Sequence, residues 1–216
     1  MLVFSFFLLD FFILMGVAEK LSISIDEVNI LMDNNAILGL LLQKLMQFTA
    51  YNDYILRLPM ITLHLLSAWL IYLIAKIYAY KKHDAIYALI IFMLLPGAIS
   101  SAVLVNTAGL LIFLLLLFIY SYKKFKTKAL FMLPFYFFID SGFLVLYIAL
   151  ALYGLHKKNK FLFYFNIIMI SIHFYWYNDT IGGLPSSHIN ELMASYAAIF
   201  SPVVFVYFFY VMNRMY

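Results

Sequence analysis

Acidic residues are concentrated in SISIDEVNILMDNN, residues 22–35, in a chain that is 67% hydrophobic and only 11% charged. Asp26 and Glu27 are adjacent there, and Asp33 follows. A carboxylate can act as a general base when it lies within hydrogen-bond reach of a hydroxyl proton, and partial withdrawal from water or a second carboxylate raises its pKa toward that task. Asp26 and Glu27 are therefore candidate acid–base residues in an extended loop. An ordinary solvated acidic loop is the alternative.

A second polar segment, NDTIGGLPSSHINEL at residues 178–192, contains His188 and Glu191. Three residues apart, these two share a face if a helix begins just before them. With Asp26 or Glu27 nearby they are candidate ligands for a divalent metal ion. Two ligands alone are fewer than protein metal sites usually have, so a helix cap with an exposed face is the alternative.

Membrane-spanning helices must position these residues. The chain has 216 residues, 20% of them aromatic, and a mean hydropathy of +1.00. A soluble domain could not hide that much apolar surface from water, so the composition predicts an integral membrane protein. The lack of cysteine excludes disulfides, thiol catalysis and cysteine-ligated metals. The net charge of +4 comes from lysines in short loops, which does not indicate nucleic-acid binding.

The hydrophobic pattern predicts an all-α, polytopic membrane bundle of about seven or eight helices, forming one domain over 1–216. Residues 129–155 are expected to form two short helices that turn at IDSG, and LPGAISS is expected to be the turn of a helical hairpin. The first span is interpreted as a retained helix rather than a signal peptide. The candidate spans are 1–18, 58–79, 85–98, 102–121, 161–177 and 192–213.

Charge segregation predicts the orientation. The loops YKKHD, SYKKFKTK and HKKNK hold nine of the fourteen lysines and arginines, whereas most acids lie on the other side. This is the positive-inside pattern, and it places the N-terminus in the cytoplasm and segments 19–57 and 178–191 outside, as in the bacterial inner membrane. Within the first outer segment, NAILGLLLQKLMQF at 35–48 is predicted to be an interfacial helix, with Gln43 and Lys44 as its polar patch.

Four ionisable residues fall within or between the predicted apolar helices. Such residues are costly in a membrane and usually face protein. Asp10 is expected to face protein, with an amide or hydroxyl as its partner, whereas His64 and His173 are either functional or neutral side chains bonded to a neighbouring helix. Asp140 either reaches the site or terminates a helix.

The order of these features resembles the N-terminal transmembrane half of the GT-C glycosyltransferases, in the protein O-mannosyltransferase and aminoarabinose (ArnT-like) transferase branch. A first span precedes the DE pair and an interfacial helix, after which YILRLPMITLHLLSAWLIYLIAKIY, LLPGAISSAVLVNTAGLLIFLLLLFIY and two short helices follow. The likeness covers roughly residues 1–155. YAAIFSPVVFVYFFYVMNR looks like a later span of the ArnT-like proteins.

This resemblance implies transfer of a sugar from a polyprenyl-phosphate carrier to an acceptor (a lipid, glycan or protein) at the outer membrane face. Asp26 would be the general base, and Glu27 would orient the loop or modulate its charge. Arg57 of RLP would face the lipid phosphate or anchor its helix, with Lys44 and His188 as further phosphate-binding candidates.

The chain departs from the family pattern in three places. DNNAILG stands where the family usually has His/Lys-Pro-Pro, Asn106 of LVNTAG stands where an Asp is common, and family members are longer. These departures favour the alternative of a noncatalytic membrane subunit or scaffold that associates with another membrane protein. A transporter or channel is the third hypothesis. The predicted position of the polar residues, at the outer surface rather than at the membrane midplane, argues against it.

Overall fold

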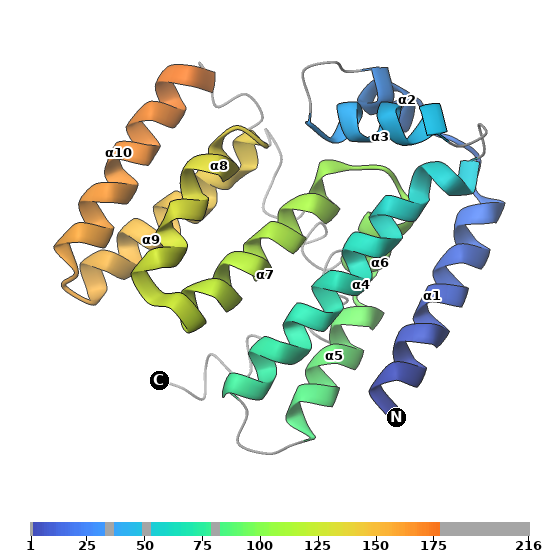
Figure 1. The fold of residues 1–216 in the computed structure, drawn as a ribbon, viewed down its shortest axis with the longest axis horizontal. Coiled ribbons are helices and arrows are strands. Elements are labelled where there is room, and N and C mark those ends of the chain that lie inside the picture. The colour runs from blue at the N-terminus through green and yellow to red at the C-terminus, as the bar shows by residue number, and fades with distance from the viewer. Residues whose placement is uncertain (1, 33–36, 49–52, 79–82, 178–216) are drawn as a thin grey trace, which may run out of the picture. The chain divides into compact units, whose positions relative to one another are not determined.

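In the computed structural model, every regular element within 2–32, 37–48, 53–78 and 83–177, the residues that the structure describes, is helical (Figure 1). This confirms the all-α class. The elements are α1 (Leu2–Lys20), α2 (Ile25–Met32), α3 (Ile37–Phe48), α4 (Asp53–Tyr78), α5 (Asp84–Leu94), α6 (Pro96–Val103), α7 (Thr107–Phe125), the 3-10 helix η1 (Lys126–Met132), α8 (Leu133–Phe137), the 3-10 helix η2 (Ser141–Phe143), α9 (Leu144–His156) and α10 (Lys160–Tyr177).

Two helical stretches within the described ranges are long and apolar enough to cross a membrane, Ile55–Tyr78 and Thr107–Phe137. The bent pair α5 and α6 is a third if it forms one span. The complete bundle of about seven or eight helices stays a prediction. The expected span 192–213 and outer segment 178–191 lie outside the described residues.

The hairpin turn predicted at LPGAISS is wrong. That stretch is helix α6, and the chain bends by 60° between α5 and α6. Leu95 has extended backbone angles, because the residue before a proline is disfavoured in the α-helical region. Pro96 then suits the first turn of α6, where its missing N–H has no intrahelical partner to lose. The extended Leu104 ends α6 and leads into α7.

The described residues fall into two compact units, one up to Phe113 and one from Leu114. In the first unit, α1, α4 and α6 pack around Leu14, Ala18, Ile61 and Ala102. The two buried alanines let the helix backbones approach closely, as small residues do between helices in membranes.

The acidic stretch contains a helix, α2, where an extended loop was expected, so that prediction is wrong. The helix predicted at 35–48 is confirmed as α3. Leu38, Leu42 and Met46 form the buried stripe of α3, which packs against α4 and Val105. Leu40 and Leu41 remain exposed on the outer face of α3. Its position in the membrane interface stays a prediction.

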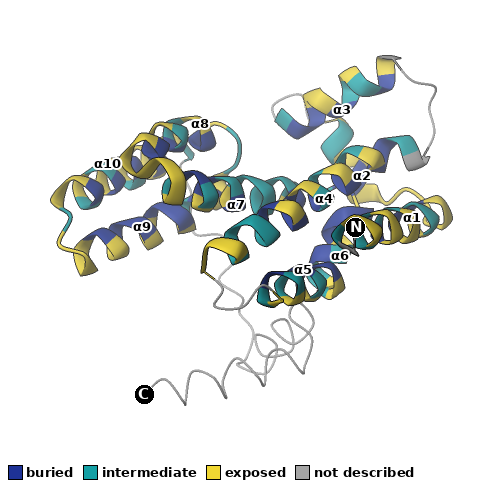
Figure 2. Ribbon diagram, turned by 60° about the horizontal axis from the view of Figure 1, so that its bottom comes forward, coloured by how far each residue is buried: buried dark blue, intermediate teal, exposed yellow. Residues whose placement is uncertain are grey.

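In the second unit, the predicted turn at IDSG is confirmed. Asp140 caps η2, because its side chain accepts a hydrogen bond of 2.7 Å from the backbone N–H of Gly142. The antiparallel helices α9 and α10 follow, and they approach so closely that a Cβ on Gly154 would lie 2.8 Å from the backbone nitrogen of Phe163. Figure 2 shows exposed residues, in yellow, along the outer faces of both helices. Many of these are large and apolar, including Leu152, Phe161 and Ile168, as expected of helices that face lipid.

Candidate functional site

The acidic stretch begins with a capping box. The Ser24 hydroxyl accepts a hydrogen bond of 3.2 Å from the backbone N–H of Glu27, and the Glu27 carboxylate accepts one of 2.9 Å from the backbone N–H of Ser24. These reciprocal bonds satisfy two donors that the start of a helix would otherwise leave open. They place Asp26 and Glu27 together in the first turn of α2, where negative charge is favoured by the helix dipole.

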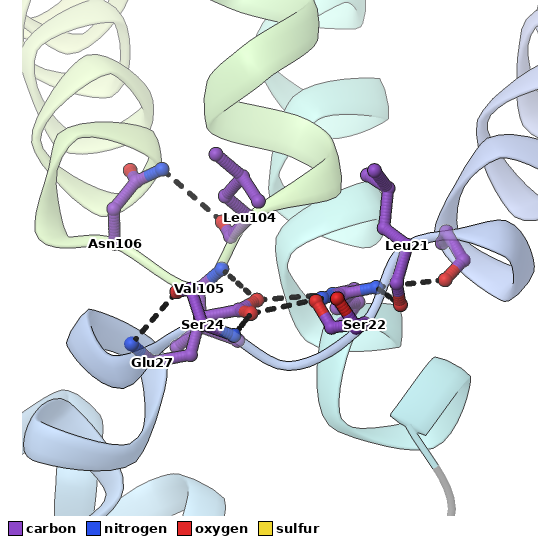
Figure 3. Close-up of polar contacts among 9 residues, drawn as sticks. Leu21, Ser22, Ser24, Glu27, Leu104, Val105 and Asn106 are labelled. Atoms are coloured by element: carbon purple, nitrogen blue, oxygen red, sulfur yellow. Dashed lines mark hydrogen bonds and ion pairs between the residues drawn. The ribbon is translucent and has the colours of Figure 1, made fainter.

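Arg57 is fully buried and binds residues on both sides of it. Figure 3 shows several of these partners, Leu21, Ser22 and Glu27, close together. The Nε and Nη2 of Arg57 donate hydrogen bonds of 3.0 and 2.8 Å to the two carboxylate oxygens of Glu27. Its Nη1 donates to the carbonyl oxygens of Ala18 and Leu21, at 2.8 and 2.6 Å, and Nη2 donates to that of Ser22 at 2.8 Å. A guanidinium has five N–H donors, so all of them are engaged.

The Glu27 carboxylate is equally saturated. Besides the bonds from Arg57 and Ser24, it accepts one of 3.0 Å from the backbone N–H of Val105, which makes four bonds to its two oxygens. Burial by itself would raise the pKa of Glu27, but the hydrogen bonds from Arg57, Ser24 and Val105 and the charge of Arg57 outweigh it. They lower the pKa of Glu27 from 4.5 to about 2, so the group is ionised at neutral pH.

This arrangement, which we call the Glu27–Arg57 clamp, joins four parts of the first unit. Arg57 comes from α4, Glu27 from α2, the three carbonyl oxygens from the end of α1 and the residues after it, and Val105 from the α6–α7 connection. A buried ion pair stabilises only when further hydrogen bonds satisfy both groups, and here they do. The clamp therefore holds the start of α2 in a fixed position.

Asp26 differs sharply from its neighbour. It is exposed, and no hydrogen bond or ion pair joins it to another residue in the described part of the chain. The two carboxylates thus have separate roles available to them. Glu27 is committed to the fold, and Asp26 is the carboxylate that can reach a reactant.

Asn106 caps the start of α7 beside the clamp. Its side-chain oxygen accepts a hydrogen bond of 3.1 Å from the backbone N–H of Gly109, and its amide donates to the carbonyl oxygen of Leu104 at 3.1 Å. Figure 3 shows Asn106 on the same connection as Val105. This is the position where the resemblance leads one to expect an aspartate.

The predicted phosphate-binding residues differ in whether they are free to bind a ligand. Arg57 has no donor left for a phosphate in this arrangement, whereas Lys44 is exposed on α3. Gln43, the other polar residue of α3, donates a hydrogen bond of 2.7 Å to the carbonyl oxygen of Leu31 and so ties α3 to the end of α2. His188 lies outside the described residues, and its phosphate-binding role stays a prediction.

The proposed metal site also depends on undescribed residues, because both His188 and Glu191 lie beyond Tyr177. Within the ranges that the structure describes, no three residues of the types His, Cys, Asp or Glu come close enough to hold a metal ion. The Glu27 carboxylate is already saturated, which leaves Asp26 as the member of the acidic pair able to take part in such a site.

Three further ionisable residues of the apolar helices are not members of the clamp. The Nε2 of His64 is 3.2 Å from an oxygen of Asp10, so Asp10 faces protein as expected, but its partner is an imidazole rather than an amide or hydroxyl. His64 also stacks on the ring of Phe92. In the second unit, His173 is fully buried among aromatic rings, the nearest being that of Tyr177 at 4.6 Å.

Five residues that bind Glu27 or Arg57 were not predicted: Ala18, Leu21, Ser22, Ser24 and Val105. Ser24 has a sequence signal, because a Ser followed three residues later by Glu just before an apolar run is the pattern of a capping box. Val105 has none, because it contributes a backbone N–H that any residue other than proline would carry.

Comparison of the chain with protein-family models, with curated proteins and with solved structures gave no match. The resemblance to GT-C glycosyltransferases therefore stays a hypothesis that depends on the order of features in the sequence.

Proposed function

We propose that the chain is a membrane glycosyltransferase of the GT-C type, in the bacterial inner membrane, which transfers a sugar from a polyprenyl-phosphate donor to an acceptor at the periplasmic face. The observation that carries the proposal is the contrast between Asp26 and Glu27. A buried, fully bonded ion pair fixes the start of α2, and the adjacent carboxylate is exposed on that fixed turn. A positioned carboxylate is what a general base requires.

In the proposed reaction Asp26 accepts the proton of the acceptor hydroxyl. The resulting oxygen nucleophile attacks the anomeric carbon of the sugar. The bond between that carbon and the phosphate oxygen breaks, and polyprenyl phosphate leaves with the bonding electrons. Lys44, exposed on α3, is the described cation proposed to contact the phosphate, while Arg57 positions α2.

The test measures release of polyprenyl phosphate from polyprenyl-phosphate hexoses and pentoses by the purified full chain in liposomes, with membrane lipid extract as the source of acceptor. General-base catalysis typically contributes about 10²–10⁴-fold, so Asp26→Asn should lower the rate by that factor. The variant should fold and insert normally, because Asp26 has no partner within the described residues to lose. Full activity of Asp26→Asn would disprove the assignment of the base.

A noncatalytic membrane subunit is the second candidate, and two observations favour it. The donors of Arg57 are all committed to the fold, and Asn106 caps α7 in place of an acid. This role predicts no turnover of any polyprenyl-phosphate sugar. It also predicts that the gently purified chain retains another membrane polypeptide, equally well for wild type and for Asp26→Asn. Turnover by the chain alone would eliminate it.

A further inference from the structure

The second unit carries its positive charge at one end. Seven lysines lie in this unit, all of them exposed: Lys123, Lys124, Lys126, Lys128, Lys157, Lys158 and Lys160. Asp140 is the sole acid among its described residues, 114–177. One end of the unit is therefore strongly cationic.

Contacts within the unit show that the two lysine groups belong to the same end. Lys126 and Lys128 lie in η1, which precedes α8, and Lys160 is the first residue of α10, so both lysine groups stand at the helix ends away from Phe137 and Tyr177. At the other end, the hydroxyl of Tyr177 donates a hydrogen bond of 2.7 Å to the carbonyl oxygen of Phe137, close to Asp140. Figure 1 shows the α7–η1 junction and the α9–α10 turn at the lower end of this unit.

Two of these lysines have left-handed backbone angles. Lys126 and Lys158, at the ends of α7 and α9, have φ values of 51° and 54°. Glycine is the usual residue at such a position after a helix, because it has no Cβ to clash there. The chain thus has a charged side chain at both turns where an uncharged glycine would fit the backbone better.

Apolar rings flank the cationic end. Phe125, Tyr153 and Phe161 are exposed beside the lysines, and the Nζ of Lys124 lies 5.4 Å from the ring centre of Phe125. Lysines with exposed aromatic rings, at the end of an apolar helix bundle, match the chemical gradient from acyl chains to lipid headgroups. A purely water-facing loop would not need the exposed rings.

We propose that this cationic end binds anionic phospholipid headgroups of the cytoplasmic leaflet. The charge is complementary to a phosphodiester headgroup, and the flanking rings occupy the boundary with the acyl chains. The proposal does not depend on glycosyl transfer, because it concerns only residues of the second unit, none of which belongs to the candidate site.

Native mass spectrometry of the full chain in micelles tests the proposal, with phosphatidylglycerol or phosphatidylcholine of the same acyl chains titrated in. Phosphatidylglycerol should bind more tightly. Raising the salt to about 1 M, where the Debye length falls to about 3 Å, should remove the difference. Each lysine near an anionic surface contributes about fivefold, so Lys126→Gly with Lys158→Gly should weaken phosphatidylglycerol binding by up to about 25-fold. Unfolding of this variant should not become easier, because glycine relieves both left-handed positions.

Matched variants separate charge from folding. Lys126→Arg with Lys158→Arg keeps the charge and should bind as wild type does. Lys157→Gln with Lys160→Gln removes two charges without altering either left-handed turn, and should weaken binding to a similar extent. Lys20→Gln, in the first unit, should have no effect. The proposal would be overturned by equal affinity for the two lipids, by unchanged binding in both charge-removing pairs, or by displacement of phosphatidylglycerol with inorganic phosphate.

Discussion

Replacing Glu27 with glutamine preserves the shape of the side chain but removes the negative charge of the clamp. One carboxylate oxygen accepts hydrogen bonds from Arg57 Nε and from the backbone N–H of Val105. The other accepts hydrogen bonds from the backbone N–H of Ser24 and from Arg57 Nη2. Whichever way the amide is oriented, its NH₂ group faces two N–H donors. The substitution therefore loses two hydrogen bonds and leaves the buried arginine without its counter-charge.

The size of this loss follows from two independent arguments. Breaking a buried ion pair by removing one partner costs about 3–5 kcal/mol. The lowering of the Glu27 pKa from 4.5 to about 2 corresponds to about 3 kcal/mol of stability at neutral pH. Glu27→Gln should therefore lower the free energy of unfolding by about 3–5 kcal/mol.

Asp26→Asn is the matched control, since it makes the same chemical change one residue away on an exposed side chain. It should cost less than about 1 kcal/mol, the usual value of a charge near a helix N-terminus. Equilibrium unfolding in mixed micelles, followed by circular dichroism, measures both variants. Equal destabilisation by the two substitutions would refute the clamp as a stabilising element.

The pH dependence provides a second test of the same reasoning. Because the folded-state pKa of Glu27 is below its ordinary value, its contribution is fully present above pH 4.5 and is lost as the pH falls from 4.5 toward about 2. Wild type should lose about 3 kcal/mol more than Glu27→Gln over this window. Parallel stability curves for the two proteins would contradict the pKa assignment.

Two further predictions concern the helix packing. Gly154→Ala should destabilise the chain by about 1–3 kcal/mol, because the new methyl group meets the Phe163 backbone, whereas Gly16→Ala, with no atom within 4 Å, should be neutral or slightly stabilising. Equal unfolding midpoints for the two variants would argue against the close α9–α10 approach. A double-mutant cycle on Asp10→Leu and His64→Leu should give a coupling energy of about 0.6–1.7 kcal/mol, and strictly additive losses would show that the pair does not interact.

Sequence reasoning assigned the residues of the candidate site to one region, and their roles as catalytic or phosphate-binding groups stay predictions. Charge pattern and hydropathy indicated that Asp26, Glu27 and Arg57 belong to one region, because all three fall in the predicted outer segment 19–57. They could not show that Glu27 and Arg57 bind each other, since the pair is separated by 30 residues and the partner carbonyls have no sequence signature. The Ser24 to Glu27 spacing is the local signal that would have indicated a helix start in place of the loop that was expected.

The bend between α5 and α6 shows a second feature that the sequence could not predict. Proline and glycine in LPGAISS indicate a break in the helix, and a break occurs at Leu95. The same proline is compatible with starting a new helix, so composition could not decide between a hairpin turn and a bend. In the structure α6 is helical, and its Ala98 and Ala102 are buried in the clusters formed with residues of α1, α4 and α5.

The clamp also sets an order of events during synthesis. Glu27 and the backbone N–H of Val105 are 78 residues apart, so at about 5–20 residues per second several seconds separate their appearance. During that interval Arg57 can already bind the end of α1 and Glu27, but one acceptor position of the carboxylate is still open. That position is filled only when the α6–α7 connection has been made, so the turn bearing Asp26 reaches its final geometry after the helices through α6 have been synthesised.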